Sequence, residues 1–368
     1  MSKLAVPVLC VCMLAAPAWA QSTEAPVTGP VTGPVAQPVT EPVTGPVTGP
    51  VTEPATASIA AQPAAEAAPE QIRIVAQRPG PGMWKVTKGE HVLWVFGMYG
   101  PVPKNMEWRS QQVETVIRNS QEYLSPPTAA AKAGFFKTIT LLPSLIGVRK
   151  NPDGATLHDV MPAEEYARWS TLKTRYLPDN DDVERERPIF AAEVLSKAAH
   201  KQAGLVDSYT VRQRVLDLVK QAKLKETSSV FELPMDNART VLKNFKKSTL
   251  GDAACLARTM ATLEQDIAAA SERANAWAKG DLDAMRKLDF ASRDEACFGA
   301  LMNSAAFEAE PEFKNMKSRA HAKWVVAAEK ALDANPSTFA ILKVEDILDP
   351  KGVIAALAAK AYAVEQPD

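Results

Sequence analysis

The sequence predicts an α/β domain in which strands from the N- and C-terminal parts form one mixed sheet and the middle is largely helical. Three observations predict it. Strand-forming runs open the domain at Met83, a further strand-forming run begins near Thr338, and helical periodicity dominates between them. Strands at both ends with helices between them are typical of one domain whose sheet joins the two ends of the chain.

The first elements expected are a hairpin and a helix. The β-rich runs Met83–Val86 and His91–Phe96 flank a turn of hairpin length at 87–90, so they predict paired strands. After Gly97 the chain turns through prolines. A helix and then a short extended run follow, marked by Val113, Val116 and Ile117 for the helix and by Tyr123 and Leu124 for the run.

The middle contains the longest predicted helix, Ala253–Ala278. Gly280 suits the position after its end, and Asp281 can cap the next helix. An earlier helix is marked by Val211, Val215, Leu218 and Ala222, and a strand is predicted at Ser228–Leu233, before Pro234. The long helix has an apolar stripe with steps of three and four residues, made of Leu256, Met260, Leu263, Ile267, Ala270, Ala274 and Trp277.

The C-terminal part continues the alternation. A capping box at Ser292–Glu295 predicts the start of a helix that contains Cys297 and Leu301. Asp349, with Pro350 at the first helical position, predicts another helix start. The remaining elements expected are a helix at 319–332, a strand at Thr338–Lys343 and a closing strand at Ala361–Val364.

The first twenty residues have the pattern of a cleavable signal peptide. Lys3 precedes a short apolar stretch, and Ala18-Trp19-Ala20 forms a cleavage site before Gln21. We therefore expect a periplasmic or secreted product. Lipid attachment at the early cysteines is disfavoured, because neither follows the usual small residues.

Composition excludes other classes. The formal net charge of −1 gives the chain as a whole no electrostatic footprint for nucleic acid or anionic lipid. We also expect no transmembrane segment in the mature chain. The nearest apolar stretch, Gly134–Val148, is interrupted by Lys137 and Pro143.

Residues 21–82 form a segment in which prolines recur at every fourth position from Pro26 to Pro54. Such a composition cannot bury a core, so we expect a disordered, extended linker. It is interpreted as a spacer, as a ligand for a proline-binding module, or as an expanded repeat without a partner.

Two cysteines, Cys255 and Cys297, remain after signal cleavage. An even pair in an oxidising compartment predicts one disulfide bond, and two separate buried thiols are the alternative.

Residues 83–368 contain motifs of a known family. The run Leu93–Gly100 followed by Pro101-Val102-Pro103, the run Thr338–Leu342 with Asp346–Gly352, Arg319 with Trp324, and the closing Ala361–Val364 come in the order that the family shows. Over these segments the chain resembles the TraB/GumN family. The resemblance implies an α/β fold and, in the family, a divalent metal held by two histidines and a glutamate, as in its metal-dependent peptidases.

This chain departs from that ligand pattern. The first histidine of the family falls on Gly100 and the second on Asp346, while the glutamate falls near Ser125-Pro126 and the asparagine on Ala320. Glycine and proline offer no ligating side chain. We therefore expect no metal and no other cofactor. The candidate cleft residues are Gly97, Tyr99, Gly100, Glu345 and Asp346.

Two functions compete. One is a non-catalytic binding or scaffold protein of the envelope, with a partner that the sequence does not identify. The other is a peptidase-like hydrolase with a remodelled site, built from Asp346, Glu345 and Tyr99 with His158 or His321 brought in by folding. The missing ligands favour the first, so the sequence favours a protein that is not an enzyme. For Glu345 and Asp346 a helix-capping role is the simpler reading.

Overall fold

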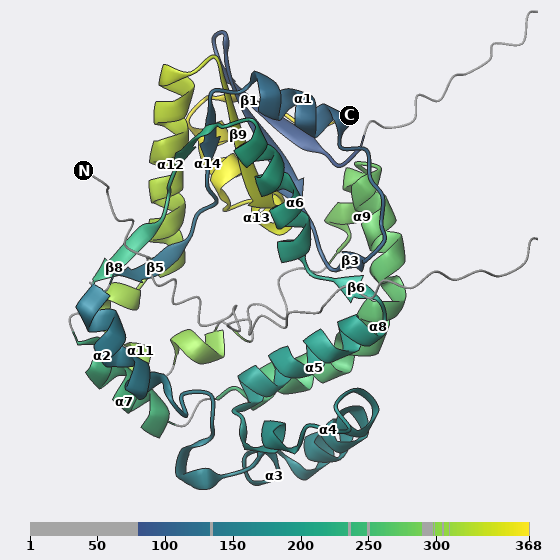
Figure 1. The fold of residues 1–368 in the computed structure, drawn as a ribbon, viewed down its shortest axis with the longest axis vertical. Coiled ribbons are helices and arrows are strands. Elements are labelled where there is room, and N and C mark those ends of the chain that lie inside the picture. The colour runs from purple at the N-terminus through teal and green to yellow at the C-terminus, as the bar shows by residue number, and fades with distance from the viewer. Residues whose placement is uncertain are drawn as a thin grey trace, which may run out of the picture. The chain divides into compact units, whose positions relative to one another are not determined.

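The computed structural model describes residues 80–132, 135–234, 237–248, 251–288, 297, 299–303, 305–308 and 310–367 (Figure 1). The predicted signal peptide, most of the proline-rich segment and the predicted capping box at Ser292–Glu295 lie outside these residues. The strands are β1 Met83–Lys88, β2 His91–Met98, β3 Val102–Pro103, β4 Glu122–Leu124, β5 Ala129–Lys132, β6 Leu205–Val206, β7 Lys225–Thr227, β8 Phe231–Pro234, β9 Ser337–Lys343 and β10 Ala363–Glu365.

The α-helices are α1 Gln111–Asn119, α2 Phe135–Leu145, α3 Leu157–Val160, α4 Ala163–Tyr176, α5 Pro188–Gln202, α6 Ser208–Gln221, α7 Ala238–Lys247, α8 Ala253–Ala278, α9 Leu282–Arg286, α11 Ala305–Glu308, α12 Met316–Ala334, α13 Val344–Leu348 and α14 Val353–Ala359. Short 3-10 turns occur at Pro152–Gly154, Asp181–Arg185 and Pro311–Phe313.

The main sheet has the strand order β10-β1-β2-β9-β4-β7. β1 pairs antiparallel with both β2 and β10, whereas β2, β9, β4 and β7 run parallel to one another. The N- and C-terminal parts therefore form one mixed sheet, as predicted. The predicted hairpin is confirmed, with Met83 opposite Phe96 and with Gly89 at φ +58° in the turn. Parallel strands need long crossovers, and the helical middle supplies them.

Each face of the sheet is covered by its own helices. Along β9, Phe339 and Ile341 contribute to a core with α1, α6 and the end of α8, while Ala340 and Leu342 contribute to a core with α12 and α14 (Figure 1). This alternation is expected, because successive side chains of a strand point to opposite faces. β9 is buried on both faces, which explains the uninterrupted apolar run Phe339–Leu342 in its centre.

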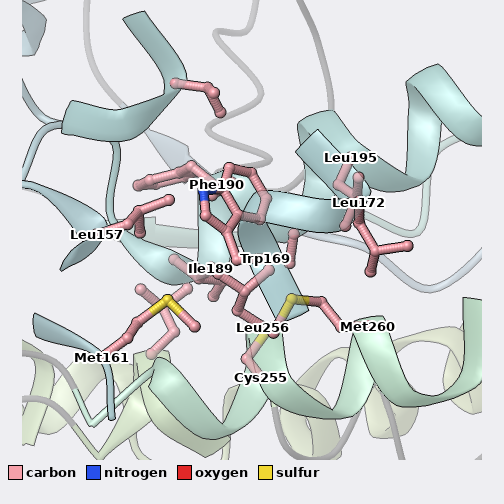
Figure 2. Close-up of a cluster of buried hydrophobic side chains, with 14 of the residues drawn as sticks. Leu157, Met161, Trp169, Leu172, Ile189, Phe190, Leu195, Cys255, Leu256 and Met260 are labelled. Atoms are coloured by element: carbon pink, nitrogen blue, oxygen red, sulfur yellow. The ribbon is translucent and has the colours of Figure 1, made fainter. Parts of the chain in front are cut away.

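The long helix α8 has the predicted bounds, and most of its apolar stripe is buried. Asp281 accepts a hydrogen bond from the Ala284 backbone NH and so caps α9, as predicted. The first part of the stripe packs into a separate helical core with Trp169 and Phe190 (Figure 2). The last part packs against the sheet through Ala274 and Trp277. α8 therefore contributes side chains both to the helical core and to the core beside the sheet.

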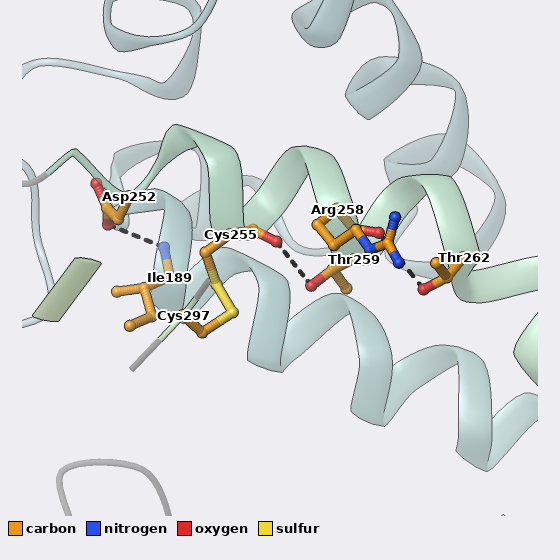
Figure 3. The surroundings of a disulfide bond; sticks show 7 residues. All are labelled: Ile189, Asp252, Cys255, Arg258, Thr259, Thr262 and Cys297. Carbon is orange, nitrogen blue, oxygen red and sulfur yellow. Dashed lines mark hydrogen bonds between the residues drawn. A yellow bond between two sulfur atoms is a disulfide. The ribbon is translucent and has the colours of Figure 1, made fainter. Parts of the chain in front are cut away.

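The predicted disulfide bond joins Cys255 of α8 to Cys297, with a Cα–Cα distance of 4.6 Å (Figure 3). Nearby, the Asp252 carboxylate accepts a hydrogen bond of 3.0 Å from the Ile189 backbone NH, at the start of α5. The disulfide bond links the helical core to the segment of the chain that contains Cys297.

The predicted helix start at Asp349 is wrong. Asp349 ends α13 instead, and its carboxylate accepts a hydrogen bond from the Lys351 backbone NH. The Gly352 NH donates to the Asp349 carbonyl, which closes a turn, and α14 begins only at Val353. The aspartate thus forms a turn that separates two short helices.

The strand predicted at Ser228–Leu233 is shorter than expected, since β8 begins at Phe231. Ser229 is bonded elsewhere: its hydroxyl donates to the carbonyls of Ser125 and Pro126. β8 pairs with β5 in a small parallel sheet and is not a strand of the main sheet.

Candidate functional site

The candidate residues follow two neighbouring parallel strands. Met98, the last residue of β2, lies opposite Lys343, the last residue of β9. Tyr99 and Gly100 therefore leave the sheet at the same edge as α13, whose first turn carries Glu345 and Asp346. The carboxyl ends of parallel strands are the usual position of ligand sites in such sheets.

Gly97 lies inside β2 and is enclosed by aromatic rings. The Trp277 indole NH donates a hydrogen bond of 2.7 Å to the Gly97 carbonyl. A Cβ at this position would lie 2.5 Å from the ring of Trp84. Beside it lies a cavity of about 10 Å³ lined in part by Trp84, Trp277 and Val344, which is about the room needed for one water molecule. Gly97 thus allows close packing of the two tryptophans.

Gly100 is pressed against the backbone at the start of α6. A Cβ at this position would lie 2.4 Å from the Ser208 backbone nitrogen and 2.7 Å from its Cα. Backbone atoms cannot move aside as a flexible side chain can. Any side chain here would therefore have to displace α6.

We expect Gly100→Ala to lower the free energy of unfolding by about 1–3 kcal/mol, the usual cost of forcing extra atoms into a packed site. The matched control is Gly251→Ala, because a Cβ at Gly251 meets nothing within 4 Å. The control is expected to stay within about 1 kcal/mol of the wild type. Urea denaturation of the three proteins measures this, and equal midpoints for the two variants would contradict the steric argument.

Tyr99 lies among charged side chains between the sheet edge and α8. Burial is the main reason that the pKa of Tyr99 is raised to about 12, and the nearby carboxylates of Glu345 and Asp266 raise it further. The Arg273 guanidinium acts in the opposite direction on the Tyr99 pKa. Arg273 also forms an ion pair of 2.9 Å with Asp266. Tyr99 is therefore a neutral hydroxyl throughout the physiological range.

Asp346 faces a different group from its neighbour Glu345. The pKa of His321, on α12, is lowered mainly by burial, while the Asp346 and Asp349 carboxylates raise it and Lys317 lowers it. Folding therefore places His321 within electrostatic range of Asp346, although no hydrogen bond or ion pair joins the two described side chains. Glu345 instead pairs with Lys343 at 2.9 Å and acts on Tyr99. That the five candidate residues line one cleft stays a prediction.

The other candidate histidine, His158, lies in α3. Its side chain is 71 % exposed and its ring packs edge-on against Tyr166 in the helical part of the molecule. Its nearest acid is its neighbour Asp159. No contact of His158 leads to the edge that carries Tyr99 and Asp346, so His321 is the better candidate of the two.

Most of the chain matches a known protein family. The model of the TraB/PrgY/gumN family matches residues 82–366. The chain belongs to the TraB/PrgY/gumN family. No curated protein and no solved structure matches it in the corresponding comparisons.

The position of the TraB/PrgY/gumN glutamate, at the end of β4, is taken by a closed hydrogen-bond pair. The Ser125 hydroxyl accepts a hydrogen bond of 3.0 Å from the Ser229 backbone NH, and the Ser229 hydroxyl donates to the Ser125 carbonyl at 2.8 Å. Both residues are buried. The two hydroxyls satisfy backbone groups of the neighbouring segment, which is a structural role.

The residues present do not fit the metal that the family resemblance implies. Gly100 has no ligand and no room for one, and Ser125 is occupied by its hydrogen bonds. Asp346 is a single carboxylate with the His321 imidazole within its electrostatic range. Within the described ranges, no group of three or more His, Cys, Asp or Glu side chains is arranged to hold a metal ion. We derive no chemistry through a metal here.

Sequence reasoning missed Arg273, which lies on α8 next to the apolar stripe. Its side chain links Tyr99 at the sheet edge with Asp266, two turns earlier on the same helix. The available signal was a pair of opposite charges seven residues apart on a helix whose buried face was already evident.

No helix of the described part is long and apolar enough to cross a membrane.

Proposed function

We propose that this chain is an exported envelope protein that uses the TraB/PrgY/gumN fold as a binding scaffold and not as a metal-dependent hydrolase. The observation that carries the proposal is the contact at Gly100, where the Ser208 backbone occupies the place of any side chain. A metal site needs several convergent ligands held by further hydrogen bonds. The paired serines at the end of β4 support the same conclusion, because they bond to backbone groups.

The test is the metal content of protein purified without chelator, measured by elemental analysis together with the Asp346→Ala variant. We expect no stoichiometric zinc, manganese or cobalt in either protein, because a single carboxylate holds a transition metal too weakly to survive purification. A His321→Ala variant serves as the control for the neighbouring imidazole. Stoichiometric metal that disappears in Asp346→Ala would overturn the scaffold proposal.

A second candidate, a hydrolase with a remodelled site, is favoured by one observation. The carboxylate of Asp346 acts on His321, and that of Glu345 acts on Tyr99, so the sheet edge carries two acid-containing pairs. A histidine within electrostatic range of a carboxylate could act as a general base if the two groups came into hydrogen-bond contact. Turnover of peptide or ester substrates that is lost in both Asp346→Ala and His321→Ala, but kept in His158→Ala, would establish this candidate.

Export is the remaining part of the proposal. Its support is the cleavage pattern at Ala18-Trp19-Ala20. We expect the mature protein to begin at Gln21 and to be recovered from the periplasm or the medium. N-terminal sequencing of the purified protein checks this expectation, and an intact Met1 on protein from the cytosolic fraction would contradict it. The Ala20→Arg variant tests the cleavage site directly. It is expected to block cleavage, because the site needs small residues.

A further inference from the structure

Helix α2 exposes apolar side chains at its C-terminal end. Leu142 is 52 % exposed and Ile146, directly after the helix, is 76 % exposed. They lie four residues apart, and the exposed Pro143 is next to Leu142. The other large apolar side chains that are exposed within the described ranges, Val160, Tyr209 and Val326, are scattered singly along the chain. Single exposed apolar residues are ordinary, whereas a cluster marks an interaction surface.

Helix α7 packs beside α2 and presents cations (Figure 1). Its inner face is fixed in the core by buried residues, including Val241 and Phe245. Its outer face carries Arg239, Lys243 and Lys247 at steps of four residues, and all three are exposed. Such spacing places them in one row along the helix.

A hydrogen bond joins the α7 helix that carries the cations to the α2 helix that carries the exposed apolar side chains. The Arg239 guanidinium donates a hydrogen bond of 3.1 Å to the Thr140 carbonyl of α2. This contact places the first cation of the row two residues from Leu142 in the sequence of α2. Lys243 and Lys247 form no ion pair with an acid in the part of the chain that the structure describes. α7 itself contains no acidic residue.

We propose that α2 and α7 together bind the surface of an anionic lipid bilayer. Leu142 and Ile146 enter the boundary between headgroups and acyl chains, while Arg239, Lys243 and Lys247 bind lipid phosphates. Charge complementarity identifies this occupant, because exposed apolar side chains flanked by exposed cations are the pattern of interfacial helices. A protein partner or a second copy would have to present acids to the same cations. The inference goes beyond the proposed function and does not depend on whether the fold is catalytic.

The experiment is flotation of the full chain, as isolated from the host, with vesicles of phosphatidylcholine alone or mixed with phosphatidylglycerol. All variants keep the same N-terminal residues, so differences among them report on the surface under test. We expect binding to the mixed vesicles and at least about tenfold weaker binding to the neutral ones. Binding is also expected to fall when salt screens the charges.

Two double variants test the two halves of the surface. Leu142→Ser with Ile146→Ser, and Lys243→Glu with Lys247→Glu, are each expected to weaken partition into mixed vesicles about tenfold or more. The matched controls are Val326→Ser, which is 49 % exposed on α12, and Lys104→Glu with Lys287→Glu, which are exposed on other elements. The controls are expected to bind as the wild type does.

Several results would overturn the proposal. They are absence of flotation with mixed vesicles, equal binding to neutral vesicles, or variants that bind as well as their controls. A dimer in size-exclusion chromatography with light scattering that the Leu142→Ser, Ile146→Ser pair dissociates would instead assign the surface to a second copy. Thermal midpoints within a few degrees of the wild type are expected for every variant, because all these side chains are exposed.

Discussion

Replacement of Arg187 by methionine is expected to lower the free energy of unfolding by about 3–5 kcal/mol, the usual cost of removing one member of a buried charged network. The Arg187 side chain is almost fully buried, with 1 % of the residue exposed. Its guanidinium lies over the Phe245 ring, 4.7 Å from the centroid. Its hydrogen bonds, of 2.8–3.1 Å, go to the backbone carbonyls of Lys150, Phe245, Lys246 and Ser248.

Three of those carbonyls belong to the C-terminal end of α7, whose last carbonyls have no partner inside the helix. Arg187 supplies that partner and a positive charge where the helix dipole is negative. Methionine has a similar volume but no donors, so these carbonyls would remain buried and unpaired. The matched control is Arg319→Met. Arg319 also lies over a ring, that of Phe231, but it is 41 % exposed.

We expect the Arg319 control to change stability by about 1 kcal/mol or less, because exposed ion pairs contribute little. Urea denaturation, monitored by circular dichroism, measures both variants. Equal losses of unfolding free energy in Arg187→Met and Arg319→Met would show that the buried Arg187 hydrogen bonds stabilise the fold no more than an exposed ion pair does.

The loss of stability in Arg187→Met is also expected to depend on pH. Burial raises the pKa of Asp252 above its ordinary value of 3.8, and the Arg187 charge acts against that rise. A carboxyl with a raised pKa contributes stability that is full below the ordinary value and is lost as pH rises through the folded-state pKa. Without Arg187 the pKa of Asp252 rises further. The penalty of Arg187→Met should therefore be larger at neutral pH than near pH 4, and Asp252→Asn should remove that difference.

Removal of the disulfide bond is the second large effect. Replacement of both Cys255 and Cys297 by alanine is expected to lower the free energy of unfolding by about 4 kcal/mol, since the bond closes a loop that spans a sequence separation of 42 and such closure restricts the unfolded chain. Cys255 is fully buried beside Leu256 in the helical core. The loss should therefore destabilise the helical core first.

Reduction of the wild type gives a readout without any substitution. A reducing agent is expected to lower the midpoint of the wild type towards that of the double variant and to leave the double variant unchanged. Mass spectrometry of the unreduced, denatured protein should find no free thiol at Cys255 or Cys297. Free thiols there would contradict the bond.

Elements with local signals could be predicted from the order of the amino acids. α8 has the predicted bounds, since its periodic stripe runs to Trp277 and Gly280, which adopts φ +68°, follows the end of the helix. The hairpin before it was predictable from two β-rich runs and their short turn. β9 and the family were predictable in the same way, from short motifs. Propensity, periodicity and capping act over a few residues, so they can be read from the chain alone.

The way in which distant segments meet became evident only in the folded chain. Nothing near Gly100 in sequence shows that the Ser208 backbone lies against it, and this contact excludes a ligand at the family's first histidine position. The stripe of α8 shows that the helix is buried but not that two separate cores share it. Adjacent acids at 345 and 346 look equivalent in the sequence, yet one acts on the pKa of Tyr99 and the other on the pKa of His321. The physical reason is that these contacts depend on the path of long crossovers between parallel strands, which local residue preferences do not specify.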